Sequence, residues 1–285
     1  MKINLAKSAG FCFGVKRALD IAIETAQKKE KVVMLGDIVH NEKVVQKITQ
    51  SGIKKINSLK PSRNQALLIR AHGEPKIVLK SARRLGYKIV DATCPMVKEI
   101  HKIVNNMENK GYTVIVIGDK KHDEVRGITG QLKKKSLVIE KPDRIPLAKI
   151  KRIKKAAVVV QSTQNLNNAF KIVKLLKKYI PDLKFFNTIC KPTQIKQAEI
   201  KNMPKNNSCM IIIGSKNSAN TKRLYEISKR LNKNSWRVNS KKEIKPAWVK
   251  NAKSIGIAAG ASTPKETIDD IIRHLSNPAL SRRRQ

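Results

Sequence analysis

The sequence predicts an α/β protein made of three similar units, each with a small, mainly parallel sheet covered by helices. The first observation is a repeat in which a cysteine is followed by a glycine 24 residues later and by a histidine or serine 28 residues later. It occurs at Cys12, Gly36 and His40, at Cys94, Gly118 and His122, and at Cys190, Gly214 and Ser218. The second observation is that short apolar segments alternate with helix-like ones. Recurrence at a fixed spacing indicates repeated structural units.

The elements of the three units follow one another in the same order. A helix is expected after each cysteine, over 14–29, 95–110 and 191–203, and then an apolar strand at 32–35, 113–117 and 209–213. Second helices are expected at 42–50, 124–132 and 219–231, and second strands with small or polar tips at 66–73, 156–163 and 254–263. Third helices are expected at 75–86, 167–180 and 264–275. Closing strands lead to the next cysteine at 87–94 and 183–190.

The third unit has no closing strand of its own, but the chain begins with a strand-like segment, 2–12, that ends at a cysteine and has no unit before it. We therefore expect the N-terminal strand to complete the third sheet. The expected units are 1–94, 95–190 and 191–285, the last with a basic C-terminal tail, and together they would form a closed pseudo-three-fold ring. Ligands of parallel sheets bind beyond the carboxyl ends of the strands. A polar site is therefore expected at the centre of the ring.

The composition limits the possible function classes. A chain of 285 residues with 40% apolar content can bury a sizeable core. The first residues lack the apolar core of a signal peptide and the apolar runs are short, so we expect a cytoplasmic protein that does not span a membrane. The net charge of +40 favours acidic partners, but the lysines are spread from Lys2 to Lys265 and aromatics make up only 4%. A nucleic acid is therefore not expected as the main partner.

Three cysteines at equivalent positions indicate a metal cluster rather than a disulfide framework. Cys12, Cys94 and Cys190 are 82 and 96 residues apart, unlike the short paired spacings of structural zinc sites, although zinc is an alternative. Iron–sulfur clusters usually have four thiolate ligands, so three on a four-iron cluster would leave one iron open to a substrate oxygen. The fourth cysteine, Cys209, opens the apolar run CMIII and is expected to be a core thiol.

Polar side chains gather at the ends of the predicted strands. They are His40, His72, His122, Ser162, Thr163, Ser218, Asn220 and Ser262. Together with free N–H groups at helix starts, these donors predict an anion site suited to a phosphate or diphosphate. Glu124 and Glu42 occupy equivalent positions after His122 and His40, and either carboxyl could transfer a proton. Position in the sequence does not choose between them.

At these residues the sequence resembles the 4-hydroxy-3-methylbut-2-enyl diphosphate reductase family. The matching segments run in family order from Ala9 to Pro264: AGFCFGVKRAL, VHNEKVV, AHG, DATCP, KHDEVRG, NTICKPTQIKQ, GSKNSANTKRL and AGASTP. The resemblance implies a trefoil around one 4Fe–4S cluster held by Cys12, Cys94 and Cys190. It implies Glu124 as the proton source, Ser162 and Thr163 at the hydroxyl end of the substrate, and the remaining donors around the diphosphate.

The chain departs from the family pattern at two places. Ala219 stands where the family usually has a second serine before the asparagine, which removes one hydroxyl donor. Ser162 and Thr163 stand where the family usually has two threonines. Neither change affects a cysteine of the repeat or Glu124.

The implied activity is the reductive dehydroxylation of 4-hydroxy-3-methylbut-2-enyl diphosphate to isopentenyl and dimethylallyl diphosphates. This is the last step of the methylerythritol phosphate route to isoprenoids. The electrons would come from a carrier such as flavodoxin or ferredoxin, for which a basic surface is suited. Two other function classes are a nucleic-acid or ribosome-associated binding protein, favoured by charge, and a cluster-dependent dehydratase that removes water without net reduction.

Overall fold

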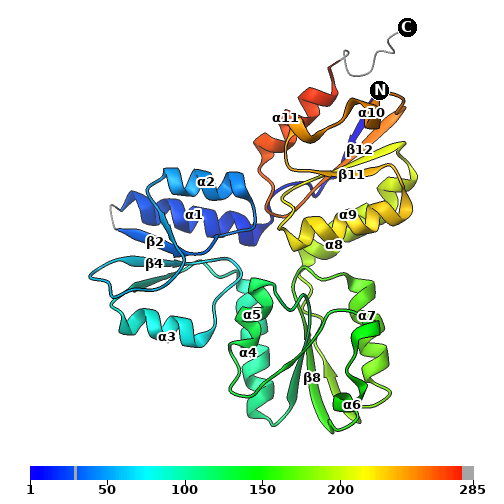
Figure 1. The fold of residues 1–285 in the computed structure, drawn as a ribbon. Coiled ribbons are helices and arrows are strands. Elements are labelled where there is room, and N and C mark those ends of the chain that lie inside the picture. The colour runs from blue at the N-terminus through cyan, green and yellow to red at the C-terminus, as the bar shows by residue number, and fades with distance from the viewer. Residues whose placement is uncertain (29–30, 278–285) are drawn as a thin grey trace. The chain divides into compact units, whose positions relative to one another are not determined.

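Three four-stranded parallel sheets form the framework of the computed structural model, which describes residues 1–28 and 31–277 (Figure 1). The first sheet has the order β3 (Lys54–Ile56), β2 (Val32–Leu35), β4 (Ala66–Ile69), β5 (Lys88–Asp91). The second has the order β7 (Leu137–Ile139), β6 (Thr113–Ile117), β8 (Lys155–Val160), β9 (Asp182–Phe185). The third has the order β11 (Ser235–Val238), β10 (Cys209–Ile213), β12 (Ser254–Ala259), β1 (Lys2–Leu5). All strand pairings among the described residues are parallel, which confirms the predicted fold class.

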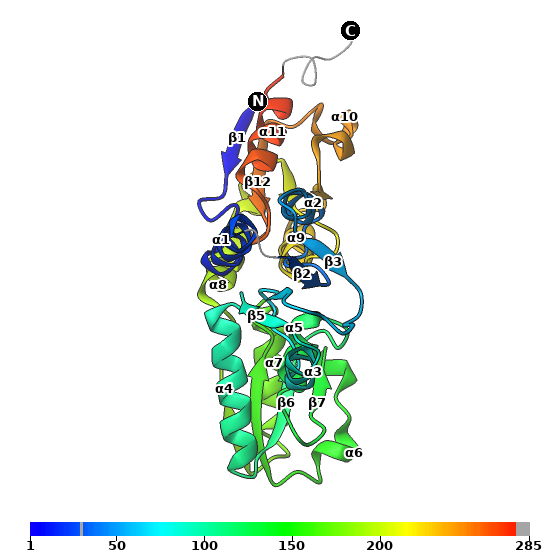
Figure 2. The same cartoon turned by 90° about the vertical axis from the view of Figure 1, so that its left-hand side faces the viewer.

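The N-terminal strand completes the third sheet, as the sequence predicts. Strand β1 pairs with β12 in the register Ile3 to Ile255, and the two strands lie side by side in Figure 2. In the third sheet β1 therefore holds the place that β5 and β9 hold in the first two.

The edge strands β3, β7 and β11 were not predicted from the sequence. They have only three or four residues, and each pairs with a single neighbour. Each edge strand also accepts a hydrogen bond at its last carbonyl from the repeated glycine. These bonds are Gly36 N to Ile56 O at 3.2 Å, Gly118 N to Ile139 O at 3.1 Å, and Gly214 N to Val238 O at 2.9 Å. The glycine of the repeat therefore marks where the edge strand ends.

The predicted helices are present, those at 42–50 and 219–231 with the predicted ends and the others with shifted ends. Those after the cysteines are α1 (Phe13–Gln27), α4 (Pro95–Asn109) and α8 (Lys191–Asn202). The second helices are α2 (Glu42–Gln50), α5 (Asp123–Thr129) and α9 (Ala219–Leu231). The third helices are α3 (Lys76–Arg84), α7 (Leu166–Leu176) and α11 (Lys265–Leu275). Short additional helices are α6 (Leu147–Ile150), α10 (Pro246–Val249) and the 3-10 turns η1 (Pro142–Arg144), η2 (Met203–Lys205) and η3 (Lys241–Glu243).

Helix α5 ends at Thr129, earlier than the predicted 132. Its C-cap is Gly130, and a Cβ there would lie 2.5 Å from Cβ of Pro75. The Gly130 carbonyl accepts a hydrogen bond from Lys76 N, at 3.1 Å. The end of α5 is therefore set by its contact with the start of α3. The last predicted residue of the first helix, 29, and the basic tail lie outside the described residues.

Helices cover both faces of the second and third sheets. In the second sheet, α7 packs on one face through Ile172 and Leu176, and α4 and α5 pack on the other through Val104 and Val125. Figure 1 shows α4 and α5 on one side of β8 and α6 and α7 on the other. In the third sheet, α11 covers one face and α8 and α9 cover the opposite face. Burial on both faces explains why the central strands read as continuous apolar runs.

The chain forms two compact units. One contains Met1–Phe13, His40–Val44 and the chain from Lys191 onward, and so holds the third sheet. The other contains Gly14–Val39 and Val45–Cys190, and so holds the first and second sheets. The division into 1–94, 95–190 and 191–285, and the closed ring, remain predictions from the repeat. Among the described helices, none combines the length and the apolar character needed to cross a membrane.

Candidate functional site

The three repeated cysteines occupy equivalent places in their sheets. The backbone N–H of each cysteine donates to the carbonyl of the residue two positions after a central strand. That strand is β12 for Cys12, β4 for Cys94 and β8 for Cys190. The bonds are Cys12 to Ala261 at 3.1 Å, Cys94 to Ala71 at 3.0 Å and Cys190 to Ser162 at 3.1 Å. The repeat seen in the sequence therefore reflects a repeated backbone geometry at the strand ends.

Each of these cysteines directly precedes a helix. Helices α1, α4 and α8 begin at Phe13, Pro95 and Lys191. Helix N-termini carry partial positive charge and favour negative groups such as thiolates. All three cysteines are partly exposed. Cys209, in contrast, is buried on β10, and burial raises the pKa of its thiol to about 11, so it is a core thiol as the sequence predicts.

Space beside the Cys94 thiol depends on a glycine. A Cβ on Gly14 would lie 2.5 Å from Sγ of Cys94, so only a hydrogen fits where α1 passes the sulfur. The loop before Cys94 is fixed by Arg17, whose guanidinium donates to Thr93 O at 3.2 Å, and by Asp91, which accepts from Thr93 N at 2.9 Å. The thiol is therefore held in place by neighbouring elements.

The loop before Cys12 is held by a buried lysine that was not predicted from the sequence. The Lys196 side chain on α8 is 4% exposed, and its ammonium donates to the carbonyls of Ser8, Gly10 (3.0 Å) and Ala259 (3.3 Å). Glu199, one turn further along α8, accepts from Ser8 N at 3.1 Å and from the Ser8 hydroxyl. A charged group buried among carbonyls is uncommon in proteins. Nothing in the sequence distinguishes Lys196 from the many lysines that lie on the surface.

Glu124 is the most deeply buried carboxyl of the predicted site. It lies in the first turn of α5, and its side chain is 1% exposed. Its two oxygens accept from Ser162 N at 2.6 Å and from Ser162 Oγ at 2.7 Å. Burial raises the pKa of Glu124 above its ordinary value, and the two hydrogen bonds from Ser162 oppose this only in part. A carboxyl with a raised pKa is suited to hold and deliver a proton.

Other predicted donors lie around Glu124 in the same unit. The rings of His72 and His122 meet edge to face, with centroids 5.4 Å apart, and His122 Nδ1 accepts from Glu124 N at 3.1 Å. The Thr163 hydroxyl accepts from Gln161 Nε2 at 3.0 Å. Gln161 is fully buried and also accepts from a backbone N–H, that of Asp119, at 2.9 Å. This glutamine, which the sequence analysis did not select, fixes the loops after β6 and β8 to each other.

Glu42 differs from Glu124 although the repeat makes them equivalent. Its carboxylate accepts from Ser215 Oγ at 2.7 Å, from Asn239 Nδ2 at 3.1 Å and from Asn217 Nδ2 at 3.3 Å. Partial burial opposes ionisation of Glu42, but the hydrogen bonds from Ser215, from its own backbone N–H, and from the two asparagines outweigh it and lower its pKa. Glu42 is therefore an ionised structural group, and of the two glutamates Glu124 is the one suited to carry a proton.

The remaining predicted donors lie in the other unit. Ser218 caps α9 by accepting from Thr221 N at 3.3 Å, and Ser262 Oγ donates to His40 O at 3.2 Å. Asn220 is 3% exposed, and neither its Oδ1 nor its Nδ2 has a hydrogen-bond partner among the described residues. A buried amide without partners is costly unless a ligand satisfies it. The buried, unpartnered amide of Asn220 therefore favours a bound polar ligand near the start of α9.

The chain is similar to known proteins over nearly its full length. The family described as LytB protein matches residues 3–276 of the chain. The chain belongs to the LytB family. It is 39% identical to the 4-hydroxy-3-methylbut-2-enyl diphosphate reductase of Geobacter metallireducens, with 96% of this chain and 97% of the relative covered. It is 37% identical to the enzyme of that name from Aquifex aeolicus, with 94% of each covered.

Solved structures of the LytB fold agree with the architecture. A solved structure of (E)-4-hydroxy-3-methyl-but-2-enyl diphosphate reductase, described as the terminal enzyme of the non-mevalonate pathway, is 36% identical, with a TM-score of 0.70 and coverage of 96% of this chain and 99% of that one. The reductase structure from Plasmodium falciparum is 26% identical, with a TM-score of 0.91 and coverage of 98% and 89%.

The residues of this LytB chain fit a metal–sulfur group at the strand ends. Three partly exposed thiols stand at equivalent helix starts, and Gly14 leaves room beside one of them. Thiolates are the ligands that iron–sulfur clusters require. The convergence of all three cysteines on one cluster remains a prediction.

Proposed function

We propose that this LytB-family chain is a 4-hydroxy-3-methylbut-2-enyl diphosphate reductase, as its relatives over nearly the full length are named. The reaction breaks the allylic C–O bond, forms a C–H bond and releases the hydroxyl as water, with uptake of two electrons and two protons. Its products are isopentenyl and dimethylallyl diphosphates, the end of the non-mevalonate route. The single observation in the site that carries the proposal is buried Glu124, whose pKa is raised and whose carboxyl contacts Ser162.

The cofactor proposed is one 4Fe–4S cluster held by Cys12, Cys94 and Cys190. When bound, this group would supply the electrons and a Lewis acid for the departing oxygen. The chain contributes the three thiols, their helix N-termini and the fixed loops that carry them. With three thiols as ligands, one iron of a four-iron cluster would stay open to a substrate oxygen.

Glu124 would be the proton source. Burial raises the pKa of Glu124 and so favours its neutral form, and Ser162 Oγ, 2.7 Å away, could relay the proton to the hydroxyl end of the substrate. Thr163, held by Gln161, would bind the same end. Protonating the leaving oxygen lets water depart rather than hydroxide, which lowers the barrier.

The diphosphate would be bound by His40, His72, His122, Ser218, Asn220 and Ser262. The buried amide of Asn220 supports this role because a phosphate oxygen and a hydroxyl could satisfy its two polar atoms. Ala219 at the first position of α9 keeps its backbone N–H, which can still donate to an anion. Holding the diphosphate would keep the allyl fragment in place until its carbon is protonated.

The electrons would reach the enzyme from a protein carrier such as flavodoxin or ferredoxin, in the cytoplasm. The competing dehydratase would need no reductant, and a nucleic-acid-binding protein would need no cluster. The deciding experiment is anaerobic purification with iron and sulfide analysis, followed by turnover of the allylic diphosphate with and without a reductant. Reductant-dependent formation of the two diphosphate products supports the proposal, and turnover without reductant contradicts it.

A further inference from the structure

Arg70 lies directly after β4 and closes the turn that carries His72. Its carbonyl accepts a hydrogen bond from Gly73 N at 3.0 Å, so His72 lies inside a tight turn. Gly73 has a φ of +75°, which glycine adopts at little cost. A Cβ on Gly73 would lie 2.8 Å from Cε1 of His101 on α4, so the turn fits closely against that helix. The backbone that carries His72 is therefore fixed on the side of α4.

The Arg70 side chain runs from this turn to the first residue of α5. Its Nη1 lies 2.6 Å from Asp123 Oδ2, and its Nε donates to Glu74 Oε1 at 2.5 Å. The side chains of Arg70, Asp123 and Glu74 are 12%, 20% and 5% exposed, so water and salt screen these ion pairs less than pairs on the surface. A guanidinium also fixes geometry, because its N–H groups point in set directions.

Asp123 lies between two residues of the site described above. His122, before it, is the N-cap of α5, and its Nδ1 accepts from Glu124 N at 3.1 Å. The rings of His72 and His122 meet edge to face, with centroids 5.4 Å apart. One guanidinium, that of Arg70, therefore links the turn of His72 to the helix start that carries His122 and Glu124.

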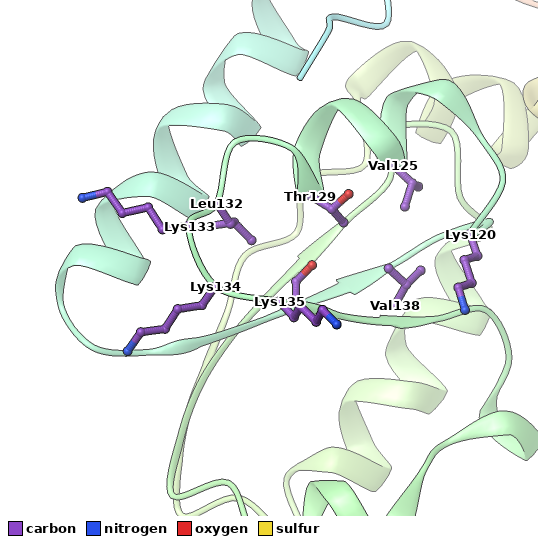
Figure 3. A pocket seen from close by; sticks show the side chains of 9 residues that line it. Lys120, Val125, Thr129, Leu132, Lys133, Lys134, Lys135 and Val138 are labelled. Carbon is purple, nitrogen blue, oxygen red and sulfur yellow. The ribbon is translucent and has the colours of Figure 1, made fainter. Parts of the chain in front are cut away.

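The side of α5 that faces β7 is incompletely packed. A hollow of about 450 Å³ lies there, with an apolar lining from Val125, Leu132 and Val138. Figure 3 shows Val125 and Thr129 pointing from α5 toward Val138 on the strand. A helix of seven residues beside such a hollow has fewer packing contacts to fix its position. The start of α5 therefore depends more on its polar contacts.

The two ends of α5 are tied to the chain after β4 in different ways. Just beyond its last residue, Gln131 Nε2 donates to Glu74 O at 2.9 Å and to Gly127 O at 2.8 Å. At its first residue the link is the ion pair between Arg70 and Asp123. Of the two links, the ion pair is the one that adjoins the proposed site.

We infer that Arg70 is a positioning residue, which holds His72, His122 and Glu124 in the arrangement that the diphosphate and the proton require. The inference rests on the reductase function proposed above and deepens it, because it adds a residue that acts on this site through Asp123. An arginine suits the task better than a lysine, because its fork can hold Asp123 and Glu74 at once.

The test measures diphosphate binding and turnover in Arg70→Met, in Asp123→Asn and in the variant with both changes. Binding to the cluster-loaded protein is followed calorimetrically with inorganic pyrophosphate as the probe. We expect each single variant to lower the pyrophosphate affinity and kcat/KM by roughly 3- to 100-fold, the range of coupling within one ion-pair network. The double variant should lose no more than Arg70→Met alone, because the link is already broken. Bound iron should stay unchanged.

Asp123→Asn separates position from charge. This change removes a negative charge beside His122, so charge alone predicts tighter binding of pyrophosphate, whereas loss of the link predicts weaker binding. Tighter or unchanged binding in Asp123→Asn would overturn the inference. Additive losses in the double variant, or a loss of bound iron, would overturn it as well.

Two further variants serve as references. Arg144→Met breaks an ion pair with Glu140 in the same unit, but the Arg144 side chain is 64% exposed, so we expect values close to those of the wild type. Arg70→Lys should recover part of the loss, because an ammonium keeps the charge but lacks the fork. A loss in Arg144→Met equal to that in Arg70→Met would overturn the inference.

Hydrogen exchange followed by mass spectrometry gives a readout that needs neither substrate nor electrons. The amides of 70–76 and 119–129 should exchange faster in Arg70→Met and Asp123→Asn, while those of β6 and β8 keep their wild-type rates. Unchanged exchange at these two segments, or faster exchange throughout the chain, would reject the positioning role. If Arg70→Met does not fold, Asp123→Asn carries the test, because it leaves the pair between Arg70 and Glu74 in place.

The same readout separates the inference from the function on which it rests. If the wild-type protein neither binds pyrophosphate nor turns over the allylic diphosphate, the reductase proposal fails. Local acceleration of exchange would then still support the link through Arg70, and its absence would reject the link too.

Discussion

Replacing Glu124 with Gln separates proton delivery from the shape of the site. The amide keeps the size of the carboxyl, its Oε1 can accept from Ser162 N, and its Nε2 can donate to Ser162 Oγ, because that hydroxyl can reverse its role. Both contacts at 2.6 and 2.7 Å can therefore persist. What disappears is the transferable proton.

The expected loss of turnover is roughly 10²- to 10⁴-fold, the usual contribution of a positioned acid. This corresponds to about 2.7–5.5 kcal/mol in the activation free energy. Substrate binding is expected to stay close to that of the wild type. The assay is steady-state turnover with saturating reductant beside a binding titration that follows the absorption spectrum of the cluster. Glu42→Gln is the matched control, and its effect should be much milder because Glu42 bonds to Ser215 and two asparagines.

The same variant predicts a pH dependence of stability. Because burial raises the pKa of Glu124 in the folded protein, the stability that its neutral form contributes is fully present below its unfolded pKa. This contribution is lost as pH rises through the folded pKa. Residue 124 does not titrate in Glu124→Gln. The unfolding temperature of this variant should therefore rise relative to that of the wild type as pH rises through this window. Near-normal turnover of Glu124→Gln, an equal loss in Glu42→Gln, or a pH-independent difference in unfolding temperature would refute the reasoning.

Three other predictions test the cluster, the anion site and the positioning of Cys12. Ser replacement of Cys12, Cys94 or Cys190 should each lower bound iron and abolish turnover, whereas Cys209→Ser should retain both; full iron and activity in Cys94→Ser would reject the ligand assignment. Ala replacement of His40, His72 or His122 should mainly weaken diphosphate binding, and Ala219→Ser should leave it unchanged or strengthen it by about 1 kcal/mol, one neutral hydrogen bond; loss of binding in Ala219→Ser would show that the loop is misplaced. Lys196→Met should lower both bound iron and the unfolding temperature, because the carbonyls of Ser8 and Gly10 lose their donor, with partial recovery in Lys196→Arg. Exposed Lys205→Met is the control, and unchanged iron content in Lys196→Met would contradict a positioning role.

The sequence by itself determined the repeat and most of what depends on local pattern. The fixed spacing from each cysteine to its glycine predicted the three units, and the unpaired segment at the start of the chain predicted that β1 would join β12. Apolar runs bounded by polar tips predicted the central strands and placed the candidate side chains at their ends. These features depend on periodicity over a few neighbouring residues, which can be read from the sequence alone.

The tertiary structure decided what depends on residues far apart in the chain. The edge strands are too short to show a period, and they exist because β2, β6 and β10 offer them a partner. Lys196 is buried because the loop before Cys12 folds over α8, across more than 180 residues of sequence. Glu124 and Glu42 have the same register, yet burial against Ser162 raises the pKa of one and three side-chain donors help to lower the pKa of the other. Desolvation and hydrogen bonding depend on the neighbours that folding brings together, so only the folded chain distinguishes the proposed acid from its structural counterpart.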